Sequence, residues 1–387
     1  MRVYTSGRMP IKCWCRNPEE GALEQARHLA DLPFLAGPVA LMPDVHQGYG
    51  MPIGGVIATK GVVIPSAAGV DIGCGVLAVR TQLTEIDTET LKKIMSSIRE
   101  NVPLGFNHRK EGIEIPALGD KQEQMVIVSQ QFESAKKQVG TLGGGNHFIE
   151  IQKGSDGFIW YMIHSGSRNL GKKVCDYYTG VAKELNQLWY SSVPKEWDLA
   201  FLPIDTHQAY SYMLEMQYCL GFSNHNREVM ATFIDLAFTN AGMPIDKKSS
   251  MKVNIQHNYA KWENVKGQNV LIHRKGATSA REGEVGVIPG SQGTSSYIVR
   301  GKGNIDSWFS SSHGAGRRMG RKVASNTLSL EDEIKRLDDK GILHSIRTKG
   351  DLDEAPGAYK DIDEVMVEQS DLVDIIVKLE PLAVIKG

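Results

Sequence analysis

The sequence predicts an α+β fold in which mixed sheets are flanked by helices, with residues 1–387 forming a single large domain. Segments typical of strands and of helices are interleaved irregularly, which disfavours the regular alternation of a doubly wound sheet. No repeat period is visible, and no proline-rich linker divides the chain. A chain of 387 residues is long enough to bury a substantial core within one such domain.

Composition narrows the class of protein. Hydrophobic residues make up 41% of the chain and charged residues 23%, which is ordinary for a globular protein. The formal net charge of -1 disfavours a basic protein that coats nucleic acid, so a polyanion would need a locally positive cleft. The most apolar region, residues 52–79, is interrupted by charges, a proline and many glycines, and is not expected to span a membrane.

The cysteines are expected to be reduced thiols. Their number is odd and their spacing is not that of a zinc knuckle. They are Cys13, Cys15, Cys74, Cys175 and Cys219. The first residues, Met1-Arg2-Val3-Tyr4, form no apolar signal segment. These features predict a cytoplasmic protein, because reduced thiols are typical of that compartment.

Helix signals recur along the chain. The segment Asn17-Pro18-Glu19-Glu20 predicts a helix start, with a capping residue, a proline at the first position and acids that favour the helix dipole. This helix is expected to reach about Asp31. A capping serine, Ser329, begins a later helix whose charges mostly face solvent. Further helices are expected at residues 88–100, 121–139, 169–190 and 206–239, the last with a break near Gly221.

Strand signals surround these helices. Residues 39–42 predict a short buried strand, and residues 53–80 alternate β-rich runs with glycine turns, as expected in the middle of a sheet. Residues 148–151 and 158–163 predict a strand pair about a Ser155-Asp156-Gly157 turn. Other strands are expected at residues 253–255, 270–273 and 297–300.

The segment Gly69-Val70-Asp71-Ile72-Gly73-Cys74-Gly75-Val76 carries the first chemical signal. A carboxylate and a thiol stand three residues apart, and the glycines allow backbone conformations that turn both toward one point. A hard oxygen donor beside a soft sulfur donor is typical of the first two ligands of a metal site. A buried structural cysteine in a glycine-rich turn is the alternative.

Four histidines occur in similar surroundings. His147 follows three glycines and an asparagine, His164 and His257 each end a predicted strand, and His313 lies in Ser311-Ser312-His313-Gly314-Ala315-Gly316. Each alone is typical of a hydrogen-bonded structural residue. Together with the Asp71 and Cys74 pair they predict a metal centre delivered from strand ends and loops. A thiolate with imidazoles favours zinc, whereas oxygen donors favour manganese, so the metal stays open.

The His313 segment also has features of an anion-binding site. Its glycines allow close backbone approach, and a basic helix is expected to follow with Arg317, Arg318, Arg321 and Lys322. Helix N–H groups and guanidinium groups would attract an anion, and the imidazole could attack a phosphorus atom held there. The alternative is a glycine loop before a solvated basic helix.

A second loop consists of small hydroxyl residues and glycines. Its sequence is Pro289-Gly290-Ser291-Gln292-Gly293-Thr294-Ser295-Ser296. Such a loop suits contacts to phosphate or ribose, although plain turns have the same composition.

A set of motifs follows one another along the chain. They are Met42-Pro43-Asp44-Val45-His46-Gln47-Gly48, Gly69 to Gly75, Gly144-Gly145-Asn146-His147-Phe148-Ile149-Glu150, His164 to Arg168, His257-Asn258-Tyr259, Arg274-Lys275-Gly276-Ala277, Pro289-Gly290-Ser291, Ser312-His313-Gly314-Ala315-Gly316, Tyr359-Lys360-Asp361-Ile362-Asp363 and Lys386-Gly387. In this order the motifs resemble the RtcB family of GTP-dependent RNA ligases, and the resemblance extends from about Lys12 to the last residue.

The resemblance implies a reaction. The family joins RNA that ends in a 3′-phosphate or a 2′,3′-cyclic phosphate to RNA with a 5′-hydroxyl, and it uses GTP and two manganese ions. Asp71, Cys74, His164 and His257 would hold one ion, and Cys74 with His147 the second. His313 would be the nucleophile that becomes guanylylated. An archease-type activator is expected by family analogy only.

The resemblance also implies binding residues. The guanylate would be surrounded by Asn146, Glu150, Asn258, Pro289, Gly290, Ser291, Gln292, Ser296, Gly314, Ala315, Gly316 and Lys386. RNA phosphates would be held by Arg168, Arg317, Arg318 and Arg321. Lys386 is next to last in the chain, where side chains usually fray, but the apolar residues 372–385 before it would carry it into the pocket.

Two other functions stay open from sequence. One is a metal-dependent phosphodiesterase that only opens cyclic phosphates and needs neither GTP nor His313. The other is a non-catalytic RNA-binding protein that has kept the fold, which would have no need of the full ligand set. The motifs do not distinguish tRNA splicing from repair of cleaved RNA.

Overall fold

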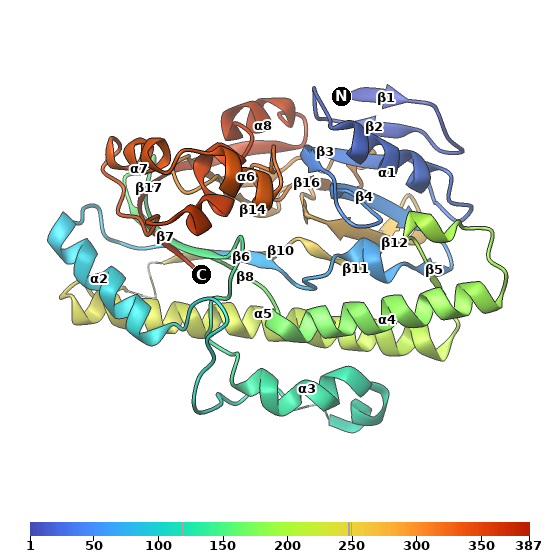
Figure 1. Ribbon diagram of the computed structural model, residues 1–387, viewed down its shortest axis with the longest axis horizontal. Helices are drawn as coiled ribbons and strands as arrows, with labels where there is room; N and C mark the ends of the chain where they lie inside the picture. The colour runs from blue at the N-terminus through green and yellow to red at the C-terminus, as the bar shows by residue number, and fades with distance from the viewer. Residues whose placement is uncertain (118, 247, 249) are drawn as a thin grey trace.

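A computed structural model describes residues 1–117, 119–246, 248 and 250–387, and it shows an α+β arrangement of two main sheets and eight helices in these residues (Figure 1). The predicted fold class is confirmed. The helices are α1 (Glu20–Ala30), α2 (Thr88–Asn101), α3 (Val126–Lys136), α4 (Arg168–Leu188), α5 (His207–Asn240), α6 (Arg321–Thr327), α7 (Leu330–Asp338) and α8 (Ile362–Glu368).

The first sheet has six strands. Their order is β1 (Arg2–Tyr4), β2 (Ile11–Cys13), β3 (Val39–His46), β4 (Ile53–Thr59), β12 (Gln268–Lys275) and β11 (Asn258–Val265). Only β2 and β3 pair in parallel. Helix α1 covers this sheet, because its buried alanines and leucines pack against apolar residues of β2, β3 and β4.

The second sheet has seven strands, all paired antiparallel. Their order is β10 (Met251–Gln256), β6 (Gly75–Arg80), β8 (Ile159–Ser165), β7 (Phe148–Gly154), β17 (Val373–Lys386), β15 (Ser296–Gly301) and β14 (Val285–Ile288). Two short pairs complete the set. They are β13 (Ala277–Ser279) with β16 (Ser310–Ser312), and β5 (Val62–Val63) with β9 (Leu202–Pro203).

The long helix α5 holds the two sheets together. It lies beside α4 along one side of the molecule (Figure 1). Toward its N-terminus, Met216 packs with α4 and with Leu271 of the six-stranded sheet. Toward its C-terminus, Ile234 and Phe238 pack with Ile163 and other apolar residues of the seven-stranded sheet. At 1.5 Å per residue, a helix of 34 residues is about 50 Å long and spans both sheets.

Several predicted elements differ in their bounds. The first helix begins at Glu20 with Glu19 as its cap, so Pro18 precedes it rather than opening it. The predicted break near Gly221 is wrong, because α5 is continuous across it. A glycine costs a helix only about 1 kcal/mol, and packing of the neighbouring Leu220 and Phe222 outweighs that cost. Residues 53–80 do not form the middle of one sheet, because β4 and β6 lie in different sheets.

Other predictions are confirmed. The strands β7 and β8 pair antiparallel around the predicted turn, and Ser329 caps α7 through its side chain. All five cysteines are free thiols. None of the helices in the described residues combines the length and the apolar character that crossing a membrane needs.

Replacing Gly221 by alanine should stabilise the protein. Gly221 lies in the interior of α5, and an added Cβ would meet no atom within 4 Å, so the gain in helix propensity should be about 0.5–1 kcal/mol in the free energy of unfolding. Gly171→Ala in α4 is the matched control and should destabilise, since its Cβ would meet the Ser167 hydroxyl at 2.0 Å and the Ile72 carbonyl at 3.0 Å. Urea denaturation measures both. A loss of stability in Gly221→Ala would contradict this account of α5.

Candidate metal and nucleotide site

The predicted ligands stand at one edge of the seven-stranded sheet. Cys74 directly precedes β6, His164 lies at the end of β8, His257 follows β10 and His147 precedes β7. The register places these ends together, because His164 pairs with Val76 on one side and with Phe148 on the other. Antiparallel pairing alternates strand starts and strand ends at one edge. Four residues that are distant in sequence therefore meet at one place.

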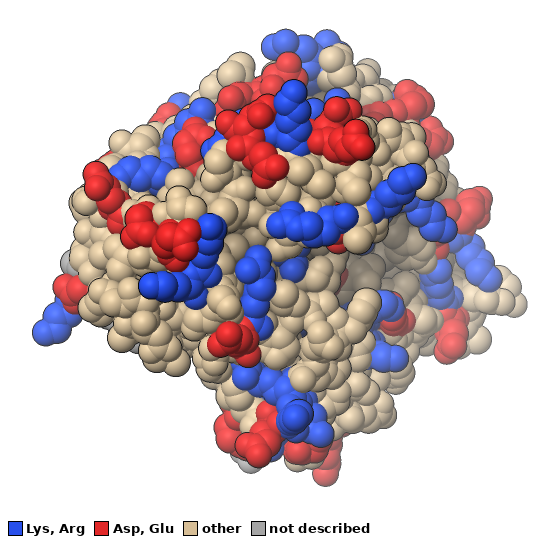
Figure 2. Space-filling view, turned by 60° about the vertical axis from the view of Figure 1, so that its left-hand side comes forward, with Lys and Arg blue, Asp and Glu red and all other residues tan. Residues whose placement is uncertain are grey.

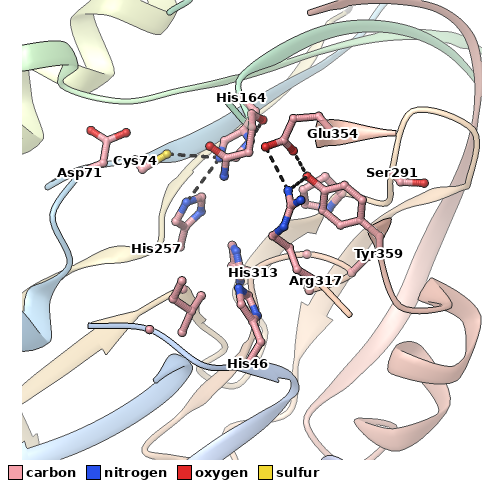
Figure 3. A pocket seen from close by; sticks show the side chains of 18 of the residues that line it. His46, Asp71, Cys74, His164, His257, Ser291, His313, Arg317, Glu354 and Tyr359 are labelled. Carbon is pink, nitrogen blue, oxygen red and sulfur yellow. Dashed lines mark hydrogen bonds and ion pairs between the residues drawn. The ribbon is translucent and has the colours of Figure 1, made fainter. Parts of the chain in front are cut away.

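The donor atoms converge within hydrogen-bonding distance. Cys74 Sγ lies 3.4 Å from His147 Nε2 and 3.3 Å from His164 Nε2, and the His164 and His257 Nε2 atoms are 3.5 Å apart. Figure 3 shows Cys74, His164 and His257 directed toward one point. Four donors around an ion with bonds of 2.0–2.3 Å lie about 3.4 Å from one another in a tetrahedral site. The observed spacing therefore fits ligands that share an ion.

Hydrogen bonds from Nδ1 to backbone carbonyls orient two of the imidazoles so that Nε2 can bind a metal. His147 Nδ1 donates to the Leu142 carbonyl and His164 Nδ1 to the Asn146 carbonyl, each at 2.9 Å. A ring with its proton on Nδ1 presents an unprotonated Nε2, which is the form that binds a metal. Burial lowers the pKa of all three imidazoles, including that of His257, and so keeps them neutral. Burial also raises the pKa of the Cys74 thiol, which a bound cation would offset.

The predicted ligands form two overlapping groups, each of which could hold a metal ion. Cys74, His164 and His257 form one, and Asp71, Cys74 and His147 form the other. The division expected from sequence assigned Asp71 to the first group. The geometry differs because Asp71 Oδ2 lies 3.2 Å from His147 Nε2. The other oxygen of Asp71, Oδ1, is buried without a hydrogen-bond partner, as expected for an atom that binds a cation.

His313 faces this cluster from the opposite side. Its ring lies edge-on to that of His257, with the centroids 4.8 Å apart (Figure 3). Its Nδ1 lies 2.6 Å from Asp44 Oδ2, and its backbone N–H donates to the same oxygen at 3.1 Å. Burial raises the pKa of the Asp44 carboxyl, but the nearby imidazole more than offsets this and the pKa lies below its usual value. The ionised carboxylate orients the ring and leaves Nε2 for chemistry.

Two further contacts fix the Asp44 backbone. Lys360 Nζ donates to the carbonyls on either side of Asp44, those of Pro43 at 3.2 Å and Val45 at 2.6 Å. Its backbone N–H donates to the Gly316 carbonyl at 2.9 Å. Gly316 has a left-handed φ of 72°, and a Cβ there would meet the Asp44 carbonyl at 2.2 Å. The motifs around Asp44, His313 and Lys360 are therefore packed as one unit.

A cavity of about 820 Å³ is lined both by predicted metal ligands and by His313. Its size is within the range of small-molecule sites. Most of the predicted site residues line it, namely Asp71, Cys74, Asn146, Glu150, His164, His257, Asn258, Pro289, Gly290, Ser291, Gln292, His313, Gly314, Ala315, Gly316, Arg317, Arg321 and Lys386.

Four predicted residues are not among those lining the cavity. His147 lies beneath it against Cys74, and the Ser296 hydroxyl accepts from the Gly290 N–H below the loop. Arg168 packs over Gly143 and lies 3.4 Å from His147 Nδ1. Arg318 lies outside the cavity, where its Nε donates to a backbone carbonyl.

The basic helix expected after His313 begins later than predicted. Only Arg321 and Lys322 belong to α6, while Arg317 precedes it in extended structure. Arg317 pairs with the buried carboxylate of Glu354 at 3.0 Å and Arg321 with the same group at 2.8 Å. Their guanidinium groups are thus partly neutralised, which the sequence did not indicate.

Lys386 reaches the cavity as expected. Residues 373–386 form β17, which pairs with β7 so that Lys386 stands opposite Phe148 and near Glu150. Burial raises the pKa of Glu150 to about 8 and lowers the pKa of Lys386. This end of the cavity offers a cation beside a carboxyl that can be protonated near neutral pH.

Sequence reasoning missed several residues of the site. Asp44 and His46 belong to the motif at residues 42–48, and Lys275 belongs to the motif at residues 274–277. The sequence alone indicates no role for any of these three residues. Burial lowers the pKa of Lys275 to about 8 within the cavity wall. Glu354 and Tyr359, whose hydroxyl donates to Glu354, also line the cavity. For Glu354 the sequence carries no signal.

The fold and site define a class of protein: an α+β chain with a buried sulfur, imidazole and carboxylate donor set facing a carboxylate-bound histidine. A family model described as tRNA-splicing ligase RtcB matches residues 25–387. The RNA-splicing ligase RtcB of Escherichia coli K12 is 37% identical over 411 residues, covering 100% of this chain and 99% of that protein.

Two more distant relatives agree. The tRNA-splicing ligase RtcB of Nanoarchaeum equitans is 30% identical over 462 residues, covering 100% of this chain and 95% of the relative. The RNA-splicing ligase RtcB homolog 1 of Entamoeba dispar is 31% identical over 449 residues, covering 96% of this chain and 83% of the relative. The chain belongs to the RtcB family of tRNA-splicing ligases, and the resemblance found in the sequence is confirmed.

Single substitutions should separate the two ligand groups. His257→Ala should remove one bound divalent ion and leave the other, since it disturbs only the first group, and Asp71→Ala should do the reverse. Cys74→Ala should lose both, because its sulfur belongs to both groups. Equilibrium dialysis followed by metal analysis measures the stoichiometry. Retention of two ions by Cys74→Ala would contradict the shared sulfur.

Proposed function

We propose that this protein is a GTP- and manganese-dependent ligase that joins RNA with a 3′-phosphate or 2′,3′-cyclic phosphate to RNA with a 5′-hydroxyl. The observation that carries the proposal is the position of His313. Its ring is held by Asp44 and contacts that of His257, with the centroids 4.8 Å apart, in the wall of a cavity of nucleotide size. A metal-dependent phosphodiesterase would not take up guanylate from GTP on that imidazole.

His313 is the proposed nucleophile. Neutral Nε2 attacks the α-phosphorus of GTP, a P–N bond forms, and the bond to the bridging oxygen breaks to release pyrophosphate. An oxygen of the RNA 3′-phosphate then takes the guanylate from Nε2 and restores neutral His313. The 5′-hydroxyl attacks the activated 3′-phosphate, a phosphodiester forms and GMP leaves. A cyclic phosphate is first opened by water to the 3′-phosphate.

The charge of Asp44 supports the first step. A phosphoramidate with the guanylate on Nε2 develops positive charge on the ring, and the carboxylate 2.6 Å from Nδ1 stabilises that charge. The same contact prevents the ring from turning Nε2 away from the substrate. Lys360 positions Asp44 by donating to the backbone carbonyls on either side of it.

The proposed guanylate site is the part of the cavity formed by two glycine-rich segments near His313 and by Lys386 and Glu150. The glycine-rich segments at residues 289–292 and 314–316 allow a phosphate to approach the backbone. Lys386 would bring a positive charge, and Glu150 a carboxyl for polar groups of the base. Asn258 is a weaker candidate than expected, because its amide already bridges Asp71 and Gly276.

Two divalent ions would be held by the groups that share Cys74. When bound, such ions supply Lewis-acid stabilisation of the phosphate oxygens that gain charge. The donors also suit zinc, so manganese is proposed from the family resemblance.

RNA would reach the cavity from the face that carries its mouth. Figure 2 shows Lys and Arg side chains gathered around a hollow on one face of the molecule, although the net charge is only -1. Arg317 and Arg321 line the cavity and are the stronger candidates for RNA phosphates, Arg168 and Arg318 the weaker ones. We infer that residues 1–387 act as one unit on RNA in splicing or repair, in the cytoplasm, and that an archease-type activator acts on it by family analogy.

Incubation with α-labelled GTP and manganese tests the proposal. The protein should become labelled without any RNA present, and His313→Ala should abolish the label because no other imidazole in the cavity has an ionised partner on Nδ1 among the described residues. His225→Ala, on the outer side of α5, is the control and should label normally. Equal labelling of His313→Ala would show that the nucleophile is misassigned.

Asp44→Asn refines the same experiment. The amide can keep the hydrogen bond to His313 but removes the negative charge, so labelling should slow by about ten- to hundredfold while metal content stays unchanged. Labelling at the wild-type rate would reduce Asp44 to a structural role.

A further inference from the structure

One side of the cavity is used neither by the metal ligands nor by the proposed guanylate residues. It is formed by the loop between β3 and β4, which contributes Gly48 and Tyr49. Of the described residues that line the cavity, only Tyr49 and Val70 are large hydrophobic side chains with an exposed surface, at 43% and 36%. The remainder of the lining is mostly polar or glycine. An exposed aromatic residue at this place calls for a reason beyond core packing.

The ring of Tyr49 is held in place before any ligand arrives. Its hydroxyl donates to Asp198 Oδ1 at 2.6 Å, and Lys183 Nζ donates to both of these oxygens at 2.7 Å. The Lys183 ammonium also lies 5.5 Å from the centroid of the ring. The main chain is fixed as well, because Lys275 Nζ donates to the Tyr49 carbonyl. A ring fixed in this way loses little conformational freedom when a flat group stacks on it.

The charges around the ring suit a strand of nucleic acid. The Lys183 ammonium lies next to the ring and is paired with Asp198, whereas the Lys275 ammonium lies at the main chain of Tyr49 and lines the cavity. Single-stranded RNA is held by aromatic rings that stack on its bases and by cations that meet its phosphates. A purely structural tether would account for the hydroxyl contact to Asp198. It would not account for a ring left exposed in the wall of the cavity that holds His313.

We propose that Tyr49 is a stacking platform for a nucleobase of the single-stranded RNA end that enters the cavity. The proposal rests on the proposed ligase function and adds to it a base contact, where the arginines offer only phosphate contacts. Every base has a flat face, so stacking accepts ends of any sequence. Tyr49 then positions the terminal nucleotide so that its phosphate reaches the guanylate on His313.

Three variants test the proposal. Tyr49→Leu removes the ring, and Tyr49→Phe keeps the ring but loses the hydroxyl. Tyr177→Leu is the matched control, since Tyr177 has the same exposed fraction of 43% but lies on α4 and does not line the cavity. Tyr49→Leu should raise KM for RNA about tenfold, and the other two variants should stay within about threefold of wild type. A merely structural tether through the hydroxyl predicts that both Tyr49 variants are impaired alike, because both lack the hydroxyl that donates to Asp198.

Labelling by α-labelled GTP without RNA separates this proposal from the proposed function. Tyr49→Leu should label at the wild-type rate, because Tyr49 is needed only for RNA. If wild-type protein neither labels nor joins RNA, the proposed function fails. If wild-type protein does both but Tyr49→Leu keeps its KM for RNA, or loses labelling, only the role of Tyr49 fails.

A substrate change identifies the base. RNA with an abasic nucleotide next to the junction, on the 3′-phosphate strand or on the 5′-hydroxyl strand, should raise KM about tenfold with wild-type protein. With Tyr49→Leu the same abasic RNA should cause no further rise, because the stacking contact is already lost. Independent, additive losses on both strands would overturn the proposal.

Discussion

The structure depends on the convergence of one sulfur, one carboxylate and three imidazoles at a buried sheet edge. Neighbouring donor atoms in this cluster stand 3.2–3.5 Å apart, and the Oδ1 atom of Asp71 is buried without a hydrogen-bond partner. Groups of this kind are costly to bury without compensation. Antiparallel pairing of β6, β8 and β10 brings them together, and the backbone carbonyls behind the rings fix their orientation. The arrangement could hold a metal ion, which would compensate for the burial of these groups.

The side of the cavity formed by the six-stranded sheet is organised around Asp44. This carboxylate extends from β3 of the six-stranded sheet to His313, which follows β16, while Lys360 holds its neighbours in place. The predicted metal ligands thus come from one sheet, and the proposed nucleophile is oriented by the other. Helix α5 packs on both sheets, so it sets the distance between the two halves of the site.

Elements that depend on short stretches of sequence could be predicted from the sequence alone. The hairpin of β7 and β8, the cap at Ser329 and the delivery of Lys386 by an apolar strand could all be predicted from sequence. The continuous course of α5 through Gly221 could not, because tertiary packing overrides a helix propensity. The sharing of Asp71 with His147, and the pairing of Arg317 with Glu354, depend on contacts between distant segments. Neither pairing leaves a pattern in the chain, so neither could be predicted from sequence.

The most direct test of the shared-sulfur centre is anomalous diffraction from crystals of the protein loaded with manganese. Two peaks are expected about 3.5–4 Å apart, both bonded to Cys74 Sγ, one beside His164 and His257 and the other beside Asp71 and His147. A single peak, or peaks that do not contact Cys74, would contradict the account.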